Sequence, residues 1–295
     1  MLVRAVVAAM LARRMDDGFQ MIHGDCLEVM RGVEAGSMDV VVTSPPYNLG
    51  IKYRSFKDTS SRGDFLDWCR AWTAEVRRVL ADDGSFFLNV GAAPANPLMP
   101  HQLLLALCDG EAPLFVLQNT FHWIKSISVE TRDGGMVSAG HFKPINSKRF
   151  VNDCHEYVFH LTKSGEVELD RRAAGVPYVY KCNISRWGHT GGEDLRCRGN
   201  NWFIPYDTIQ RRDKERPHPA TFPVALVEQC VKIHGYGMET RLMDPFLGIG
   251  SSALAARRMR VKSFTGIELD AHYLEVARER LADENEKAAG DLFGG

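Results

Sequence analysis

The stretch Asp39-Val40-Val41-Val42-Thr43-Ser44-Pro45-Pro46-Tyr47 predicts a buried strand that ends at a ligand-binding edge of a sheet. Its β-branched apolar run is typical of a parallel strand covered on both faces, and two prolines stop it. Each proline fixes its own φ, lacks an N–H and keeps the preceding residue extended. The segment therefore offers fixed carbonyl groups, a hydroxyl and an aromatic ring, which suit a planar ligand with an amino group, such as a nucleobase.

The rest of the chain alternates strands with helices. Strands are expected at 21–23, 39–43, 85–90, 115–124, 157–161, 241–243 and 263–267, and helices at 27–33, 64–80, 103–107, 223–234, 251–260 and 271–281. This alternation predicts an α/β fold with a doubly wound, mostly parallel sheet. Trp68 and Trp72 lie at helical spacing and are expected in its core, while the polar tail after Asp283 is expected to be disordered.

Composition sets limits on the class of protein. The 295 residues have a formal net charge of −1, so any nucleic-acid binding needs a local basic patch. Seven scattered cysteines form no CxxC pair, which predicts neither a metal site nor disulfides and favours the cytoplasm. The apolar stretch near the N-terminus is too short to span a membrane, and arginines follow it, so a short helix or frayed extension is expected over 1–20.

A second group of residues suggests a nucleoside ligand. Gly248-Ile249-Gly250 lies between a predicted strand and a predicted helix, and Glu268 follows about twenty residues later. Such a glycine turn lets the backbone approach a ligand, and the later acid binds ribose hydroxyls. Asp244, expected to face the same crevice, would repel a pyrophosphate but tolerate a cationic group. The sulfonium and α-amino groups of S-adenosylmethionine therefore fit better than NAD.

Four motifs together resemble the amino-group DNA methyltransferases. Thr43-Ser44-Pro45-Pro46-Tyr47-Asn48 resembles their catalytic motif, and Asp244-Pro245-Phe246-Leu247-Gly248-Ile249-Gly250-Ser251 their S-adenosylmethionine loop. His218-Pro219-Ala220-Thr221-Phe222-Pro223 and Gly24-Asp25-Cys26 resemble two further cofactor segments. The catalytic motif precedes the cofactor loop, which is the permuted order of the β group, and the resemblance covers roughly residues 20 to 282.

The resemblance implies a role for each matching residue. The catalytic residues would be Ser44, Pro45, Pro46 and Tyr47. The residues that bind S-adenosylmethionine would be Asp25, Cys26, Pro219, Ala220, Phe222, Asp244, Phe246, Gly248, Gly250, Ser251 and Glu268, with Cys26 a small buried residue rather than a nucleophile.

The motif also explains how an exocyclic amine becomes reactive. Such an amine is a poor nucleophile because its lone pair is delocalised into the ring of the base. The Ser44 hydroxyl and the Pro45 carbonyl would each accept one of its N–H groups, and Tyr47 would stack on the base. The base must first flip out of the duplex.

DNA contacts are expected in the part of the chain that lacks the alternation. We divide the chain into an extension (1–20), a catalytic half (21–126), a target-recognition region with some core strands (127–215), a cofactor half (216–282) and a tail (283–295). Basic side chains suited to phosphate and base edges are Lys143, Lys148, Arg149, Arg186, Arg196, Arg198, Arg211 and Arg212. The expected partners are double-stranded DNA, a second copy in a homodimer, and a cognate restriction enzyme or none.

The target base and the function class keep alternatives. Ser44 favours cytosine N4, whereas the continuation Tyr47-Asn48-Leu49-Gly50 is more similar to adenine enzymes and gives a small preference for adenine N6. A nicotinamide-dependent oxidoreductase would leave Ser44-Pro45-Pro46-Tyr47 unexplained. A catalytically silent DNA-binding regulator, or a methyltransferase acting on RNA or a protein amide, would keep the same fold.

Overall fold

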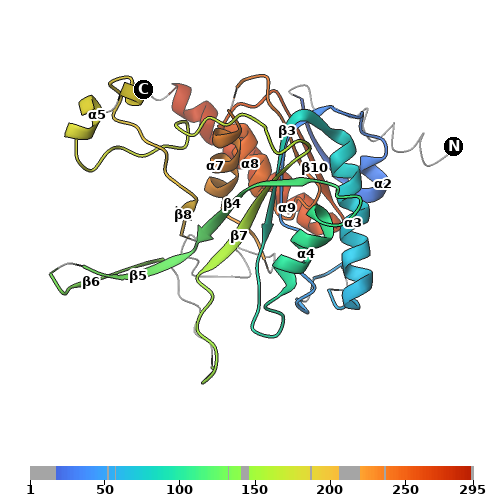
Figure 1. Ribbon diagram of the computed structural model, residues 1–295. Coiled ribbons are helices and arrows are strands. Elements are labelled where there is room, and N and C mark those ends of the chain that lie inside the picture. The colour runs from blue at the N-terminus through green and yellow to red at the C-terminus, as the bar shows by residue number, and fades with distance from the viewer. Residues whose placement is uncertain are drawn as a thin grey trace.

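The computed structural model describes residues 18–51, 53–56, 58–131, 133–140, 146–186, 188–205, 220–235 and 237–293 (Figure 1). Its elements, in chain order, are β1 (Phe19–His23), α2 (Cys26–Met30), β2 (Met38–Thr43), α3 (Arg62–Val79), β3 (Leu80–Val90), α4 (Met99–Cys108), β4 (Val116–Ile124), β5 (Ser126–Glu130), β6 (Met136–Gly140), β7 (His155–Thr162), α5 (Cys182–Arg186), η1 (Gly188–Thr190), β8 (Asn201–Phe203), α7 (Val224–Gly235), β9 (Arg241–Asp244), α8 (Ser251–Arg258), β10 (Ser263–Glu268) and α9 (Ala271–Phe293).

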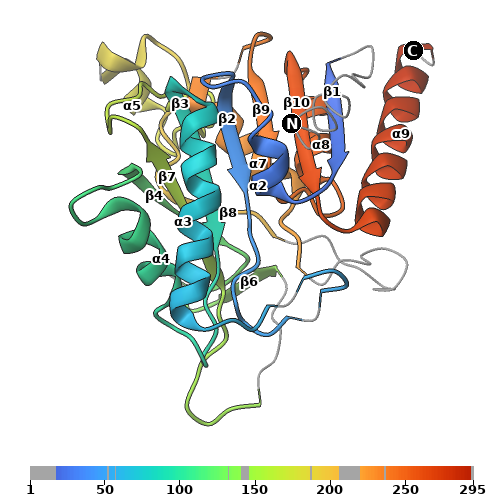
Figure 2. The same ribbon diagram turned by 90° about the vertical axis from the view of Figure 1, so that its right-hand side faces the viewer.

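A mostly parallel sheet forms the centre of the molecule. Within the described residues its strand order is β1-β10-β9-β2-β3-β7-β4-β8. The strands from β1 to β3 in this order are parallel, while β7 runs antiparallel to both β3 and β4. Figure 2 shows helices on both faces of this sheet. The α/β, doubly wound fold expected from the sequence is confirmed.

Burial on both faces of the sheet follows from the run of valines in β2. Val40 and Val42 pack into a core with α7, α8 and α9, while Val41 points into a second core with α2, α3 and α4. All three side chains are at most 1% exposed. Because successive strand residues face opposite sides, a continuous apolar run supplies both cores at once.

Strand β3 begins earlier than the sequence suggests. Leu80 pairs with Met38 and Ser85 with Val40, so the intervening Asp82-Asp83-Gly84 forms an irregularity inside the strand. The sequence pattern instead predicts a turn at these residues, ending the preceding helix. Pairing with β2 takes precedence over the local turn signal because it continues the backbone hydrogen-bond ladder on both sides.

The C-terminal segment is helical rather than disordered. Helix α9 continues to Phe293, and the Arg258 Nε on α8 donates to Glu284 Oε1 at 2.6 Å. The prediction of a disordered tail after Asp283 is therefore wrong. Glu, Lys and Ala are strong helix formers, and the ion pair holds this part of α9 to its neighbour.

The N-terminal extension expected over 1–20 overlaps β1 from Phe19 onward, and residues 1–17 lie outside the described part of the chain.

The expected target-recognition region contributes to the sheet and also departs from it. Strand β7 lies inside the sheet, and β8 pairs with the end of β4 at its edge. The hairpin of β5 and β6 projects away from the sheet, as Figure 1 shows. No helix among the described residues has the length and apolar character needed to cross a membrane.

Trp72 provides a test of the core between the sheet and helices α2, α3 and α4. It is 0% exposed and packs against Phe86 and Phe246, with ring centroids 6.1 and 5.0 Å away. We expect Trp72→Ala to lower the free energy of unfolding by about 3–5 kcal/mol, because it opens a large cavity. Urea denaturation would measure this loss. Leu105→Ala on the same side of the sheet, at a position 56% exposed, is the control; equal losses for both variants would contradict the assignment of the core.

Candidate active site

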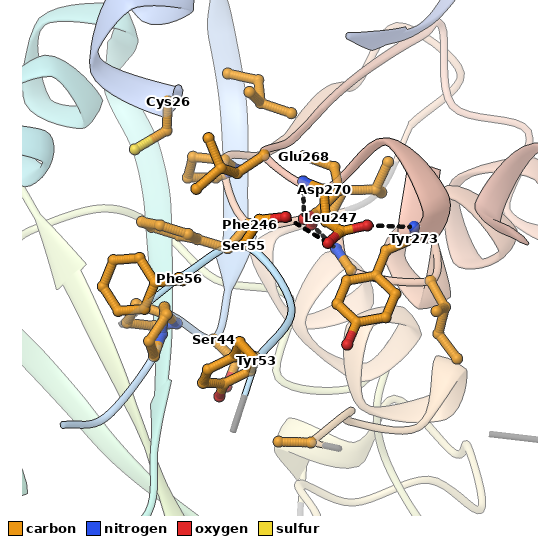
Figure 3. Close-up of a pocket in the computed structure, with 18 of the residues that line it drawn as sticks. Cys26, Ser44, Tyr53, Ser55, Phe56, Phe246, Leu247, Glu268, Asp270 and Tyr273 are labelled. Atoms are coloured by element: carbon orange, nitrogen blue, oxygen red, sulfur yellow. Dashed lines mark hydrogen bonds between the residues drawn. The ribbon is translucent and has the colours of Figure 1, made fainter. Parts of the chain in front are cut away.

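A pocket opens where the parallel strands end. Gly24 follows β1, Ser44 follows β2, Pro245 follows β9 and Leu269 follows β10, and all four line the pocket. Because parallel strands share one carboxyl edge, segments that are far apart in the chain meet there. Figure 3 shows this convergence, with Cys26, Ser44, Phe246 and Glu268 around one space.

Most residues predicted for the site line this pocket. The expected catalytic residues do so without exception: Ser44, Pro45, Pro46 and Tyr47. Of the expected cofactor residues, those at the wall are Asp25, Cys26, Ala220, Phe222, Phe246, Gly248, Ser251 and Glu268. Pro219 lies outside the described residues.

Asp244 lies behind the wall instead of facing the crevice. It is 0% exposed, and its Oδ1 accepts hydrogen bonds from Thr43 Oγ1 at 2.6 Å and from the Phe246 N–H at 3.0 Å. Its Oδ2 accepts one from Ser252 Oγ at 2.6 Å. Burial raises the pKa of this carboxyl to about 6. The expected position in the crevice is wrong, because these three donors hold the carboxylate between β2 and the start of α8.

Gly250 shapes the glycine loop without lining the pocket. Its φ is +83°, in the left-handed region, and it stands directly before α8. A Cβ built there would lie 2.9 Å from the Cβ of Ala277 on α9, which is too close for any side chain. The glycine is therefore needed for the turn and for close packing of the helix.

Glu268 is held by two backbone amides. Its Oε2 accepts the Gly248 N–H at 2.7 Å and its Oε1 accepts the Asp270 N–H at 2.8 Å. Burial raises the pKa of the Glu268 carboxyl to about 7. An ionised carboxylate has lone pairs beyond those two contacts, so Glu268 can also accept hydrogen bonds from hydroxyl groups of a ligand in the pocket.

The segment after the catalytic motif folds around a buried carboxylate. Asp58 is 3% exposed and accepts the backbone N–H groups of Asn48 at 2.7 Å, Leu49 at 3.0 Å and Ile51 at 3.0 Å. Asn48 has a φ of +56°, and its side chain exchanges hydrogen bonds with the backbone of Ser60. These contacts fix the path of the chain from Tyr47 onward.

This segment also reaches the cofactor half of the molecule. Ser55 Oγ donates to Asp270 Oδ2 at 2.6 Å, as Figure 3 shows. Asp270 Oδ1 accepts the N–H groups of His272 and Tyr273 at the start of α9. Sequence reasoning missed Ser55 and Asp270; an acid just before a helix, two residues beyond Glu268, was the available signal.

Aromatic side chains form one side of the pocket. Trp68 lines it, with ring centroids 5.3 Å from Phe56 and 5.6 Å from Phe246. Trp68 packs against the core, as expected, and also lines the pocket, whereas Trp72 is fully buried in the core. Cys26 is buried at the wall, and burial raises the pKa of its thiol to about 12, so the thiol is neutral at ordinary pH and not a nucleophile.

Comparison with known proteins identifies the family of the chain that forms this pocket. A model of the DNA methylase family, whose members modify N6 or N4 amino groups, matches residues 38–279, which is most of the chain. The chain belongs to the DNA methylase family. The amino-methyltransferase identity predicted from the motifs is confirmed, and S-adenosylmethionine is the methyl donor of this family.

Individual relatives agree with the family assignment. The Type II methyltransferase M.ScaI of Streptomyces caespitosus is 30% identical over 273 residues, which cover 89% of this chain and 81% of the relative. The solved PvuII DNA methyltransferase, described as cytosine-N4-specific, has a TM-score of 0.64 at 19% identity and covers 92% of both chains. A protein from Thermus thermophilus, solved with S-adenosyl-L-methionine, has a TM-score of 0.56 at 23% identity and covers 90% of this chain and 93% of its own.

A polar network lies next to Ser44 in this DNA methylase. The Ser44 and Tyr47 hydroxyls form a short hydrogen bond, and Tyr47 also contacts Asn89 and Glu156. Glu156 forms an ion pair with Lys125 at 3.0 Å. Sequence reasoning missed Asn89, Lys125 and Glu156, because they lie on or beside other strands and belong to no local motif.

The methylase distributes the predicted DNA-binding residues over both ends of the sheet. Lys148 and Arg149 are exposed in the segment that leads into β7, at the pocket edge. Arg186 ends α5, which lies at the opposite end of the sheet in Figures 1 and 2. Arg198 Nε donates to the Ala174 carbonyl and Arg196 Nη1 to the Cys197 carbonyl, so these two side chains brace their own region. Lys143, Arg211 and Arg212 lie outside the described residues.

The raised pKa of Glu268 predicts how stability of the ligand-free methylase depends on pH. Between its ordinary pKa of 4.5 and about 7, the folded protein keeps a proton that the unfolded chain releases. Stability is therefore lost as the pH rises through this window. We expect Glu268→Gln, which removes this titration, to become more stable relative to the native protein between about pH 5 and about pH 8. Thermal unfolding across that range measures the difference, and a pH-independent difference would contradict the argument.

Proposed function

We propose that this methylase transfers the methyl group of S-adenosylmethionine to cytosine N4 in double-stranded DNA, at a pocket that Ser44-Pro45-Pro46-Tyr47 shares with the cofactor. The observation that carries the proposal is the meeting of this motif with Phe246, Gly248 and Glu268 in one cavity. A methyl donor and an amine bound there would lie side by side. Proximity of this kind supplies a large part of the rate enhancement in transfer reactions.

The pocket residues suit S-adenosylmethionine. Its sulfonium supplies an activated methyl group. Glu268 would accept the ribose hydroxyls, and the backbone of Gly248 and Phe246 would lie against the nucleoside. Asp25 caps α2 through the Leu27 N–H at 2.9 Å, which fixes the adjacent Cys26 at the wall. Trp68, Phe56 and Phe246 offer aromatic faces, which attract a cation such as a sulfonium.

Ser44 and Pro45 would activate the amine by accepting hydrogen bonds. The Ser44 hydroxyl oxygen would take one N–H of the amine and the Pro45 carbonyl the other. The nitrogen then becomes more tetrahedral, and its lone pair is available to the methyl group. Acceptors fixed before the reaction stabilise the positive charge that develops on nitrogen. The base would enter after flipping from the duplex, with stacking on Tyr47 offsetting part of the unstacking cost.

Two observations support cytosine as the proposed target base. The preference for adenine depended on Asn48-Leu49-Gly50, but Asn48 and Leu49 give their N–H groups to Asp58. The Asn48 side chain pairs with Ser60, so this pattern has a structural cause independent of the base. Ser44 lines the pocket, whereas Asn48 and Leu49 do not, and a serine at this position of the motif favours cytosine. The PvuII enzyme with the same fold is described as cytosine-N4-specific. Adenine N6 is the second candidate.

DNA would approach from the pocket edge of the sheet. Lys148 and Arg149 are suited to its phosphates there, and the hairpin of β5 and β6 projects from the same region. Arg186, at the opposite end, has no such position. The homodimer, the cognate restriction enzyme and the cytoplasmic location expected from the sequence remain predictions.

Analysis of the methylated product tests the function and the base. The protein is incubated with S-adenosylmethionine and unmethylated plasmid, and the digested nucleosides are identified by mass spectrometry. We expect N4-methylcytosine; N6-methyladenine would overturn the choice of base, and the absence of both would overturn the function.

We expect Ser44→Ala to lower kcat by about a hundredfold, because one fixed acceptor is lost. Ser37→Ala, before the other end of β2, is the control.

Cofactor affinity should depend on pH through Glu268. The ionised carboxylate accepts hydrogen bonds from both ribose hydroxyls, whereas the protonated acid has fewer acceptor sites. We therefore expect affinity for S-adenosylmethionine to rise as the pH increases through about 7, where Glu268 ionises. Calorimetric titration of the native protein and of Glu268→Gln would measure this. A native profile as flat as that of the variant would refute the role of Glu268.

A further inference from the structure

The hydroxyl of Ser44 can present either its oxygen or its hydrogen to the pocket. Activation of an amine needs the oxygen, because the amine N–H is itself a donor. The short contact between Ser44 Oγ and Tyr47 Oη leaves the direction of the shared hydrogen open. The neighbours of Tyr47 therefore decide whether Ser44 faces the pocket as an acceptor or as a donor.

Glu156 sets that direction from the far end of the network. Its side chain is 13% exposed, and its Oε1 accepts from Lys125 Nζ at 3.0 Å. Its Oε2 lies 3.2 Å from Tyr47 Oη. A carboxylate paired with an ammonium group only accepts hydrogen bonds, so the Tyr47 hydroxyl must donate to it. Tyr47 Oη is then an acceptor toward Ser44.

Asn89 reinforces the same direction. It is 2% exposed, and its Nδ2 lies 2.7 Å from Glu156 Oε2 and 2.8 Å from Tyr47 Oη. The Nδ2 group also lies 3.3 Å from Ser44 Oγ, so its two shortest contacts are to Glu156 and Tyr47, and all three neighbours are hydrogen-bond acceptors toward it. The reverse orientation would place the amide oxygen against the carboxylate. Among the described residues Asn89 Oδ1 has no hydrogen-bond partner, so the orientation of the amide depends on Glu156.

We propose that Glu156 is a positioning residue that orients the hydroxyl chain through Tyr47, so that Ser44 Oγ faces the target amine as a hydrogen-bond acceptor. The inference rests on the proposed function, because it concerns the amine bound at Ser44. Gly91 supports it, since a Cβ there would lie 3.1 Å from Glu156 Cδ and 3.2 Å from Tyr47 Cε2. The end of β3 thus leaves room for this pair to meet.

The isosteric variant Glu156→Gln keeps the size of the side chain, allows the hydrogen bond to Tyr47 to reverse, and replaces the ion pair with Lys125 by a neutral contact. The amide of a glutamine can donate to Tyr47 Oη. The Tyr47 hydroxyl then donates to Ser44 Oγ, and the Ser44 hydrogen points at the amine. We expect kcat to fall about tenfold or more, comparable to the loss of an oriented dipole in other active sites, while the KM for S-adenosylmethionine stays unchanged.

A double-mutant cycle separates positioning from a merely structural role. Methyl transfer to plasmid DNA is measured for the native protein, Glu156→Gln, Ser44→Ala and the double variant, with radiolabelled S-adenosylmethionine. If Glu156 acts through Ser44, Glu156→Gln has little further effect in the Ser44→Ala background. Thermal unfolding and cofactor binding report whether each variant folds. Glu166→Gln, an exposed position after β7, is the matched control.

Each result supports or overturns the inference. A strong loss in Glu156→Gln that disappears in the Ser44→Ala background supports it. Full activity of Glu156→Gln, an equal loss in both backgrounds, or a parallel loss of cofactor binding overturns it. Full activity of Ser44→Ala overturns the proposed function itself, so failure of the inference alone is recognised by an inactive Ser44→Ala together with an active Glu156→Gln.

Discussion

The buried carboxylate of Asp244 is the contact on which the site depends. It joins Thr43, the last residue of β2, to Ser252 at the start of α8 and to the turn at Phe246. A buried carboxylate is costly unless donors surround it, and here a strand, a helix and a loop each supply one. The catalytic motif and the glycine loop are thereby fixed relative to each other, although Thr43 and Asp244 are 201 residues apart in the chain.

Local sequence patterns predicted the parts of the molecule that depend on local chemistry. The valines of β2, the prolines after it and the glycines before α8 each carry their own physical reason, and the structure has them where they were expected. Asp244 was misplaced because a carboxylate at a strand end fits a ligand contact as well as a buried brace. Glu156, Lys125 and Ser55 were missed because their roles arise only when β7, β4 and the segment after Tyr47 come together.

The segment that follows Tyr47 connects the two halves of the pocket. Asp58 accepts hydrogen bonds from the backbone N–H groups of Asn48 and Leu49. Ser55 donates a hydrogen bond to Asp270, just before α9. Glu268, two residues earlier, is held by amides of the glycine loop and of Asp270. Hydrogen bonds therefore connect Glu268 at the cofactor wall, through Asp270, to Ser55 in the segment that follows the catalytic motif. The aromatic group of Phe56, Trp68 and Phe246 links the same two halves by packing.

The strand order also bears on synthesis by the ribosome. β1 and β2 are made first, yet in the sheet β10 and β9 lie between them. β2 can pair early with β3, but β1 lacks β10 and β2 lacks β9 until these late strands are made, so the hydrogen-bond ladder between β1 and β2 closes last. A nascent polypeptide therefore has no complete pocket until β9 and β10 are made, because Pro245 and Leu269 after these strands line it. Truncated products of interrupted translation, which lack the glycine loop, would have only one wall of the pocket.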